Sequence, residues 1–578
     1  MKYYSKRNLL ILTGLLFFHN TSAAPFKPSD YHNFKTTSSL LKEWANQYSA
    51  IMKLTSEGKT LSGNDIWAVT LSARKDATKA PAVLIVGCVE GTDVVASEIC
   101  LQFIRLITTH YTSTDSIKQL LENTTFYIFP NVNPDASEAF FRKPLNESGM
   151  NAHSLDLDKD GLVDEDGPDD LNHDGLITMM RVTDPTGDWI ADADIPALLR
   201  KADPTKGETG HYRLFTEGID NDKDGLWNED AVGGVNFNMN FPYHYIYFKA
   251  GTGMYPISER ESRAVIDFAY NHPNIDAVFS FSPDDNLIHP WDAEATKNNN
   301  AASTETEFQS KPVEKVQADD APYFKHIAER FQKHVNTKDV PPAAKPAGAF
   351  SEWAYYHFGR WSFSCRAWWP PVIKTTADST DSTAANQKKS KPKDDPIADQ
   401  RRLWQFVQAT NPDNGFVPWT PIIQPDFPGQ QVEVGGFRPF IGTNPPADSL
   451  ESVSNAFNPF LVSLASSLPK LEITKYELKK VQQNAYRLEL IVGNTGFLPT
   501  HTAIGKHSQW NPKIKIALIR TDNQKLLTGQ KQIIIDPLPG HGRSEPFRWL
   551  IQGKPGSTIR LTVGRPATGV IEKTVVLP

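Results

Sequence analysis

PNVNPDASEAFFRK, at residues 130–143, is the stretch that decides the fold, and two further stretches belong with it. GGVNFNMNFPYHY stands at 233–245, and YPISERESRAVIDF follows at 255–268. One short motif of this kind is weak evidence, whereas three motifs in a fixed order are strong evidence. The apolar run PAVLIVG at 81–87 and the helical pattern SEICLQFIRLI at 97–107 add a buried strand followed by a helix. Together they predict an α/β fold in which helices cover a sheet.

In order and wording, the three motifs resemble those of the zinc carboxypeptidases, the carboxypeptidase A-like metallopeptidases, which read PNxNPDG, GVDLNRNFP and SEPETRA. The resemblance covers about residues 35–465. It implies a mixed central sheet flanked by helices, zinc as the cofactor and carboxypeptidase activity. We expect this carboxypeptidase-like domain to occupy residues 30–468, with an acidic-loop insertion at 150–235.

The zinc-binding positions of that family carry other residues here. The family's HxxE motif aligns with CVEGTDVVASE, which puts Glu90 in place of the histidine and Asp93 in place of the glutamate. The third ligand, a histidine that precedes a PW dipeptide, falls at Phe281. Zinc prefers nitrogen and sulfur donors, and a phenyl ring offers no donor atom at all. We call these three positions the former zinc site and expect zinc to be absent.

The catalytic base and the substrate clamp of the family are replaced as well. The strand that carries the catalytic glutamate aligns with WSFSCRAWW, which places Arg366 at the position of the base. A guanidinium keeps its proton in proteins, so it cannot act as a general base. The Asn–Arg pair that holds the substrate carboxylate aligns with Asn238 and Met239, and a second arginine of the family falls at Leu145. We therefore expect no catalytic residue, and a pseudoenzyme that binds a peptide or a protein partner.

A working metallocarboxypeptidase with substituted ligands is an alternative. His244, His272 and His289 lie near the aligned positions in the sequence and contain the donor atoms that zinc requires. The two interpretations differ in whether any of these imidazoles reaches the former zinc site.

The substitutions also invert the charges that the family has at this site. Two acids, Glu90 and Asp93, replace metal ligands, and Arg366 replaces an acid. Because buried charges are normally paired, we expect the Arg366 guanidinium to bridge one or both carboxylates. A third interpretation is a hydrolase with new chemistry, in which the two acids join Asp284 and Asp285 in an acid–base or hard-cation cluster.

Three acidic loops repeat one spacing within residues 150–235. Carboxylate or amide oxygens stand at alternate positions ahead of a glycine, an arrangement that converges on one hard cation, and calcium suits this ligand type and number. The predicted ligands are Asp156, Asp158, Asp160 and Asp164, with Asp166 as a further one, in the first loop; Asp170, Asn172 and Asp174 in the second; and Asp220, Asp222, Asp224 and Glu229 or Asp230 in the third. We interpret the calcium as structural, because these carboxylates repel one another without a cation. The alternative is a solvated acidic loop.

Two further segments differ in composition from the carboxypeptidase-like part. Short alternating segments separated by Gly, Pro and Asn turns predict a C-terminal antiparallel β-sandwich over 469–578. Residues 374–396 are rich in Ser, Thr, Lys and Asp and lack periodicity, which predicts a disordered loop.

The N-terminal sequence predicts export. Basic residues, a short apolar run and small residues succeed one another in 1–23, which is typical of a cleaved signal peptide. We expect a periplasmic or extracellular protein, and no membrane span after cleavage, because no later segment is apolar enough. The net charge of −7 and the lack of a basic stripe argue against nucleic acid as a partner.

The cysteine count excludes a disulfide scaffold. The chain contains 3 cysteines, Cys88, Cys100 and Cys365, so at least one thiol is free. Cys88 and Cys365 stand next to the former zinc site and the aligned base, which allows a reactive or metal-binding pair. We favour the interpretation that they are small buried residues, since cysteine is often fully buried.

Overall fold

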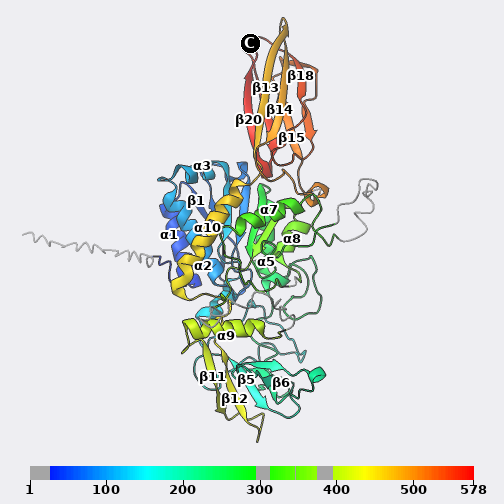
Figure 1. Cartoon of the computed structure of the whole chain (residues 1–578). Helices are drawn as coiled ribbons and strands as arrows, with labels where there is room; N and C mark the ends of the chain where they lie inside the picture. The colour runs from blue at the N-terminus through cyan, green and yellow to red at the C-terminus, as the bar shows by residue number, and fades with distance from the viewer. Residues whose placement is uncertain (1–25, 295–312, 345–346, 374–394, 509) are drawn as a thin grey trace, which may run out of the picture.

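The computed structural model in Figure 1 spans the whole chain. The structure describes residues 26–294, 313–344, 347–373, 395–508 and 510–578. The predicted signal peptide at 1–23 and nearly all of the predicted disordered loop at 374–396 lie outside the described residues, so both stay predictions.

A mixed six-stranded sheet forms the centre of the main domain, in the order β1-β2-β4-β3-β9-β10. Its strands are β1 (Met52–Lys59), β2 (Asp65–Leu71), β4 (Thr125–Phe129), β3 (Ala82–Val86), β9 (Ile275–Phe281) and β10 (Trp361–Cys365). The pairs β1/β2 and β2/β4 are antiparallel, whereas β4, β3, β9 and β10 run parallel. Every residue of these four parallel strands is buried, as expected for strands that are covered on both faces.

Helices cover both faces of this sheet, which confirms the predicted α/β class (Figure 1). One face packs against α1 (Phe34–Gln47), α2 (Val95–His110), α3 (Asp115–Asn123), α7 (Ala321–Phe331) and α10 (Leu450–Ser466). The other face packs against α5 (Arg260–Asn271) and α8 (Phe350–Tyr356). Because β3, β4, β9 and β10 are parallel, the loops that follow them meet at one edge, where ligands bind in open α/β sheets.

A second six-stranded sheet is assembled from two distant parts of the chain. Its order is β11-β12-β5-β8-β6-β7, and every neighbouring pair is antiparallel. The strands are β5 (Met179–Thr183), β6 (Trp189–Ala191), β7 (Leu199–Lys201), β8 (Tyr212–Thr216), β11 (Phe416–Ile422) and β12 (Val432–Phe437). The acidic-loop insertion therefore contributes four strands to a small sheet. In Figure 1 this sheet lies below the main domain, with α9 (Ala398–Thr410) between the two.

Two antiparallel four-stranded sheets form the C-terminal module, as the sequence predicted. Their orders are β13-β14-β18-β16 and β17-β15-β19-β20. The strands are β13 (Leu471–Gln482), β14 (Ala485–Asn494), β15 (Ile514–Ile519), β16 (Lys525–Thr528), β17 (Gln532–Ile535), β18 (Phe547–Gln552), β19 (Thr558–Arg565) and β20 (Gly569–Val576). Alternate residues of both sheets share one apolar core, which includes the buried Trp549.

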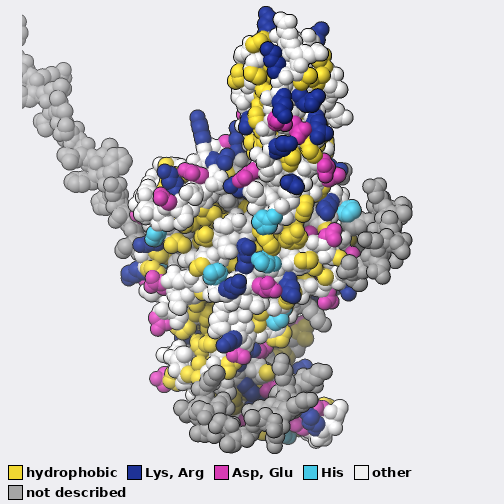
Figure 2. Space-filling model, turned by 45° about the horizontal axis from the view of Figure 1, so that its top comes forward, with side chains coloured by type: hydrophobic (Ala, Val, Ile, Leu, Met, Phe, Trp, Pro, Cys, Tyr) yellow, Lys and Arg dark blue, Asp and Glu magenta, His cyan; other side chains and the backbone are white. Residues whose placement is uncertain are grey.

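Charge is distributed unevenly between the two parts. Figure 2 shows acidic, basic and apolar side chains interspersed over the main domain, and Lys and Arg outnumber Asp and Glu in the C-terminal module. In the part of the chain that the structure describes, no helix is both long and apolar enough to cross a membrane.

Candidate functional site

The former zinc site lies at the edge of the sheet where the parallel strands end. The turn between β3 and α2 carries Glu90 and Asp93, and Asp93 is almost fully buried. Burial raises the pKa of Glu90 above its usual range. The pKa of Asp93 is raised to about 8, mainly by burial and secondly by the negative charge of Glu90. Asp93 therefore holds its proton at neutral pH, because the neutral form of a buried carboxyl needs no charged partner.

The Glu90 carboxylate is held by two asparagine side chains. Asn236 Nδ2 donates to one oxygen at 3.0 Å, and Asn238 Nδ2 donates to the other at 2.9 Å. Both asparagines belong to the second motif, around the short helical turn η4 (Phe237–Met239). Each carboxylate oxygen thus has a neutral donor, and no cation is needed to satisfy it.

The amide of Asn238 is fully committed to neighbouring groups. Besides Glu90, its Nδ2 lies 2.9 Å from Ser282 Oγ and 3.0 Å from Asp284 Oδ1. Its Oδ1 accepts a hydrogen bond from the backbone N–H of Phe350 at 3.0 Å. Two N–H bonds serve three acceptors, so Asn238 has no donor left to offer a substrate carboxylate.

The two aspartates that follow β9 point to different partners. Asp284 accepts hydrogen bonds from the hydroxyls of Ser282 and Ser351, and burial raises its pKa. Asp285 instead accepts from the backbone N–H of His289 at 2.8 Å and lies 2.9 Å from Nδ1 of the same histidine. The structure therefore joins Glu90 to Asp284 through Asn238, whereas Asp285 is engaged elsewhere.

The expected bridge from Arg366 to the acids is wrong. Among the described residues, Arg366 forms no ion pair with Glu90 or Asp93: its Nη2 donates to the Pro342 carbonyl at 3.2 Å, and its buried Nε has no hydrogen-bond partner. Its positive charge still lowers the pKa of both acids to some degree. The pairing argument failed because Glu90 is satisfied by neutral amides and Asp93 keeps its proton, so neither acid requires a cation.

Phe281 is part of the apolar core under the sheet. The side chain is fully buried, with its ring centre 4.9 Å from that of Phe279 and 5.3 Å from that of Phe457 on α10. Met239, at the position of the clamp arginine, lies beside Gly251. A Cβ added to Gly251 would lie 3.5 Å from the Met239 sulfur. Neither residue offers a charged or strongly polar group to this edge of the sheet.

The three histidines that could supply replacement ligands lie apart. His244 Nδ1 is 3.1 Å from a Glu352 oxygen, and His272 Nδ1 is 2.8 Å from the Phe268 carbonyl. His289 pairs with Asp285, as described above. Within the described ranges, none of them joins a group of three or more metal-ligand atoms that lie within 4.8 Å of one another.

The cysteines next to this edge are core residues. Cys88, Cys100 and Cys365 are all free and buried, and burial raises the pKa of each thiol. A buried thiol with a raised pKa is a poor nucleophile and a poor metal ligand. The favoured interpretation of Cys88 and Cys365 therefore agrees with the structure.

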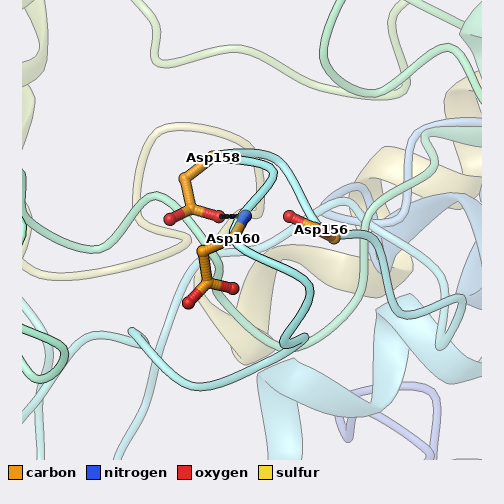
Figure 3. Close-up of side chains that lie close together, drawn as sticks. All are labelled: Asp156, Asp158 and Asp160. Atoms are coloured by element: carbon orange, nitrogen blue, oxygen red, sulfur yellow. Dashed lines mark hydrogen bonds between the residues drawn. The ribbon is translucent and has the colours of Figure 1, made fainter.

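The three acidic loops share one local geometry. In the first, Asp156 accepts from the backbone N–H of Gly161 at 3.1 Å. Asp158 accepts from the backbone N–H of Asp160 at 3.0 Å, the bond that is dashed in Figure 3. The second and third loops repeat these two bonds, from Gly175 to Asp170 and Asp174 to Asn172, and from Gly225 to Asp220 and Asp224 to Asp222. The glycine has a positive φ in every loop, 97°, 83° and 95°, which a residue with a side chain rarely adopts.

Among the described residues, close groups of carboxylates join only the first and third loops. Asp158 belongs to three groups of close carboxylates: with Asp156 and Asp160 of its own loop, with Asp222 and Asp224 of the third loop, and with Glu165 and Asp230. The predicted ligands of the second loop, Asp170, Asn172 and Asp174, take part in no such group among the described residues. Sequence reasoning missed Glu165, although the first and third loops both end in the pair ED, which was an available signal.

Two separate parts of the chain match models of known protein families. Residues 37–161 match the model described as Zinc carboxypeptidase, and residues 470–576 match a domain of unknown function, DUF8731. A zinc carboxypeptidase of Saccharothrix mutabilis subsp. capreolus is 30% identical over 119 residues, 20% of this chain and 27% of the relative. Carboxypeptidase D of Mus musculus is 27% identical over 158 residues, 27% of this chain and 12% of the relative. Part of this chain, residues 37–161, is thus similar to the zinc carboxypeptidases.

These zinc carboxypeptidase relatives are matched over less than a third of their own length. Among solved structures, the crystal structure of thrombin activatable fibrinolysis inhibitor (TAFI) is similar at 12% identity and a TM-score of 0.41, with 77% of this chain and 76% of that chain covered.

The three motifs that resemble those of the zinc carboxypeptidases form hydrogen bonds between loops of the main domain. Asp135, in the first motif, accepts from the Thr60 hydroxyl at 2.7 Å and from Asn64 Nδ2 at 2.8 Å, and so fixes the turn between β1 and β2. Asn240, in the second motif, accepts from the Ser262 hydroxyl of the third motif at 2.7 Å. Residues of these motifs therefore connect loops of the main domain, which explains why the motifs predict the fold.

Proposed function

We propose that this protein is an exported, catalytically inactive member of the zinc carboxypeptidase family that binds a peptide or a protein partner and is stabilised by calcium. The observation that carries the proposal is the Glu90 carboxylate, whose two oxygens accept hydrogen bonds from Asn236 and Asn238. The Glu90 oxygens, which would have to face a metal in order to bind it, face two side-chain amides instead.

The residues at the former zinc site do not fit zinc. Phe281 has no donor atom and its ring is buried beneath the sheet. Glu90 and Asp93 are both carboxyl groups, whereas zinc sites in proteins rely mainly on nitrogen and sulfur donors. These two carboxyl groups do not replace a set of three protein ligands, so the site cannot activate water through zinc.

Two further groups that zinc carboxypeptidases use, the general base and the donor for the substrate carboxylate, have no equivalent here. Arg366 cannot accept a proton from water, and Asn238 has no free donor for a terminal carboxylate. The proposal therefore excludes both activation of water and the family's mode of substrate binding.

A separate surface feature supports a binding role. A cavity of about 580 Å³ is lined by aromatic rings and by the exposed cations Arg142, Lys143 and Arg438, with Asp174 as its acid. The Phe140 ring, on its wall, packs against Phe440 with ring centres 5.3 Å apart. Aromatic and arginine side chains dominate binding hot spots, so the cavity suits a peptide segment that carries acidic groups.

Calcium is the cation that fits the acidic loops. Glu165, Glu229 and Asp230 contain buried carboxylate oxygens that have no hydrogen-bond partner. Oxygen donors at alternate positions of a turn suit a hard cation that takes six to eight ligands, which describes calcium better than magnesium. Export rests on the signal-peptide pattern of residues 1–23.

The test is a carboxypeptidase assay combined with metal analysis of the purified full-length chain. We expect no release of C-terminal residues from standard substrates, with or without added zinc, and no stoichiometric zinc after dialysis. Chelator-sensitive cleavage together with one equivalent of zinc would overturn the proposal. A second candidate, a hydrolase built on Glu90 and Asp284, is favoured by their shared contact with Asn238, and it requires cleavage that Glu90→Gln abolishes.

A further inference from the structure

The first and third acidic loops, residues 156–166 and 220–230, form a reciprocal pair, which we call the paired loops. The backbone N–H of Leu157 donates to Asp230 Oδ1 at 2.7 Å. The backbone N–H of Asn221 donates to Asp166 Oδ1 at 3.0 Å. Leu157 and Asn221 are the second residues of their loops, and Asp166 and Asp230 are the last ones. The final aspartate of each loop therefore accepts a hydrogen bond from the backbone of the other loop.

The two exchanged carboxylates are buried but differ in how they are satisfied. Asp166 is 0% exposed, and its second oxygen accepts from the backbone N–H of Asn228 at 2.5 Å. Asp230 is 1% exposed, and its Oδ2 has no hydrogen-bond partner. A buried carboxylate oxygen without a donor is costly, so Asp230 requires a partner that lies outside the protein's own donors.

Other oxygens converge on the same place from the first loop. One carboxylate oxygen each from Asp158, Glu165 and Asp230 lie within 4.8 Å of one another, and Glu165 Oε2 is also buried without a partner. Asp158 in addition lies within this distance of Asp222 and Asp224. Because three acids at this spacing repel one another, a cation between them offsets the repulsion and gives Glu165 and Asp230 a partner.

We propose that a single calcium ion binds between the paired loops, held by Asp158 and Glu165 of the first loop and Asp230 of the third. The first loop supplies two ligands and the third loop supplies one, so neither loop binds this ion without the other. The second loop, residues 170–178, lies outside this unit. This inference rests on the proposed stabilisation by calcium, and adds which residues form the site and which loops act together.

The experiment uses the full-length chain, stripped of divalent ions, with calcium chloride as the titrant. Asp230→Asn keeps an oxygen that can accept from Leu157 but removes the charge. We expect this variant to lose one equivalent of calcium in isothermal titration, because it removes a charged ligand of the shared ion. Asp188→Asn, at an exposed acid outside the acidic loops, is the control and should leave the calcium titration unchanged.

A double-mutant cycle tests whether one ion is shared. Asp158→Asn and Asp230→Asn lie in different loops but should remove the same ion, so the double variant should bind calcium no more weakly than either single variant. Additive losses would overturn the shared site, and so would wild-type binding by Asp230→Asn.

Thermal unfolding separates a folding defect from a binding defect. In EDTA, Asp230→Asn should melt at or above the wild-type temperature, because it removes a buried charge whose Oδ2 has no hydrogen-bond donor. In calcium, it should gain less stability than the wild type. If calcium fails to stabilise the wild type, the proposed role of calcium fails; if calcium stabilises both proteins equally, only the shared site fails.

Discussion

The Asp276 carboxylate and the Arg565 guanidinium form an ion pair at 3.0 Å that joins the two parts of the molecule. Asp276 lies near the start of β9 in the central sheet, and Arg565 ends β19 of the C-terminal module. Their side chains are 2% and 1% exposed, so the pair is withdrawn from water. Arg565 and Arg360 both donate to the Asn511 side-chain oxygen, which extends the contact into a small network. The C-terminal module is therefore attached to the main domain by a specific polar contact.

We expect Arg565→Met to be strongly destabilising. Removal of one member of a buried ion pair leaves the other without its partner, which costs about 3–5 kcal/mol. Urea unfolding of the full-length chain measures this loss. Arg548→Met, which removes the exposed pair with Glu489 in the same module, is the control and should have a much smaller effect. Equal effects of the two substitutions would contradict a specific role for the buried pair.

Stability should decrease as pH rises from about 4 to about 8, in part because of Asp93. Burial raises the pKa of this group from 3.8 to about 8, so the folded state keeps a proton that the unfolded state releases within this range. Each pH unit then removes up to about 1.4 kcal/mol of the contribution from this group. Asp93→Asn should flatten the profile, and should melt above the wild type at pH 8 but near it at pH 4. An unchanged pH profile would argue against a protonated Asp93.

Asn238→Ala should destabilise the protein by about 2–3 kcal/mol. The substitution removes the donor shared by Glu90, Ser282 and Asp284, and leaves buried acceptors unsatisfied. Met239→Leu, at the next position, preserves side-chain volume and serves as the control. Equilibrium denaturation compares both variants with the wild type, and a neutral Asn238→Ala would show that the amide network adds little to stability.

Chelation should lower the melting temperature by at least about 3 °C and should make residues 150–235 sensitive to protease. The acidic loops lose their neutralising cations, and ligands that bind only the folded state stabilise it by mass action. Mass spectrometry of the fragments locates the cleavage, with the C-terminal module as the internal reference. Added calcium should reverse both effects, whereas magnesium should not. Cleavage spread evenly over the chain would contradict a local role for the loops.

Short-range features of this chain could be predicted from the sequence. The run PAVLIVG is buried on both faces as β3, because strands within a covered parallel sheet consist of continuous apolar residues. The DxDxDG spacing also predicted the turn geometry correctly, since Asp156 bonds Gly161 and Asp220 bonds Gly225, five residues away in each case. These bonds depend on local backbone geometry, which neighbouring residues determine.

Long-range pairing could not be predicted in this way. Sequence reasoning paired Arg366 with Glu90 because their charges are opposite, but the structure gives Glu90 to Asn236 and Asn238. It treated the acidic loops as independent, but the structure exchanges Asp166 and Asp230 between two of them.

The sequence by itself thus determined the central sheet, its covering helices, the C-terminal module and the shape of each acidic loop. Tertiary structure alone decided which donor reaches Glu90, which loops meet at Asp158, and that β12 completes a sheet with β5 from the insertion. The reason is physical. Periodicity and turn chemistry act over a few residues, whereas several donors of similar strength compete for one buried carboxylate, and the packing of the whole chain selects among them.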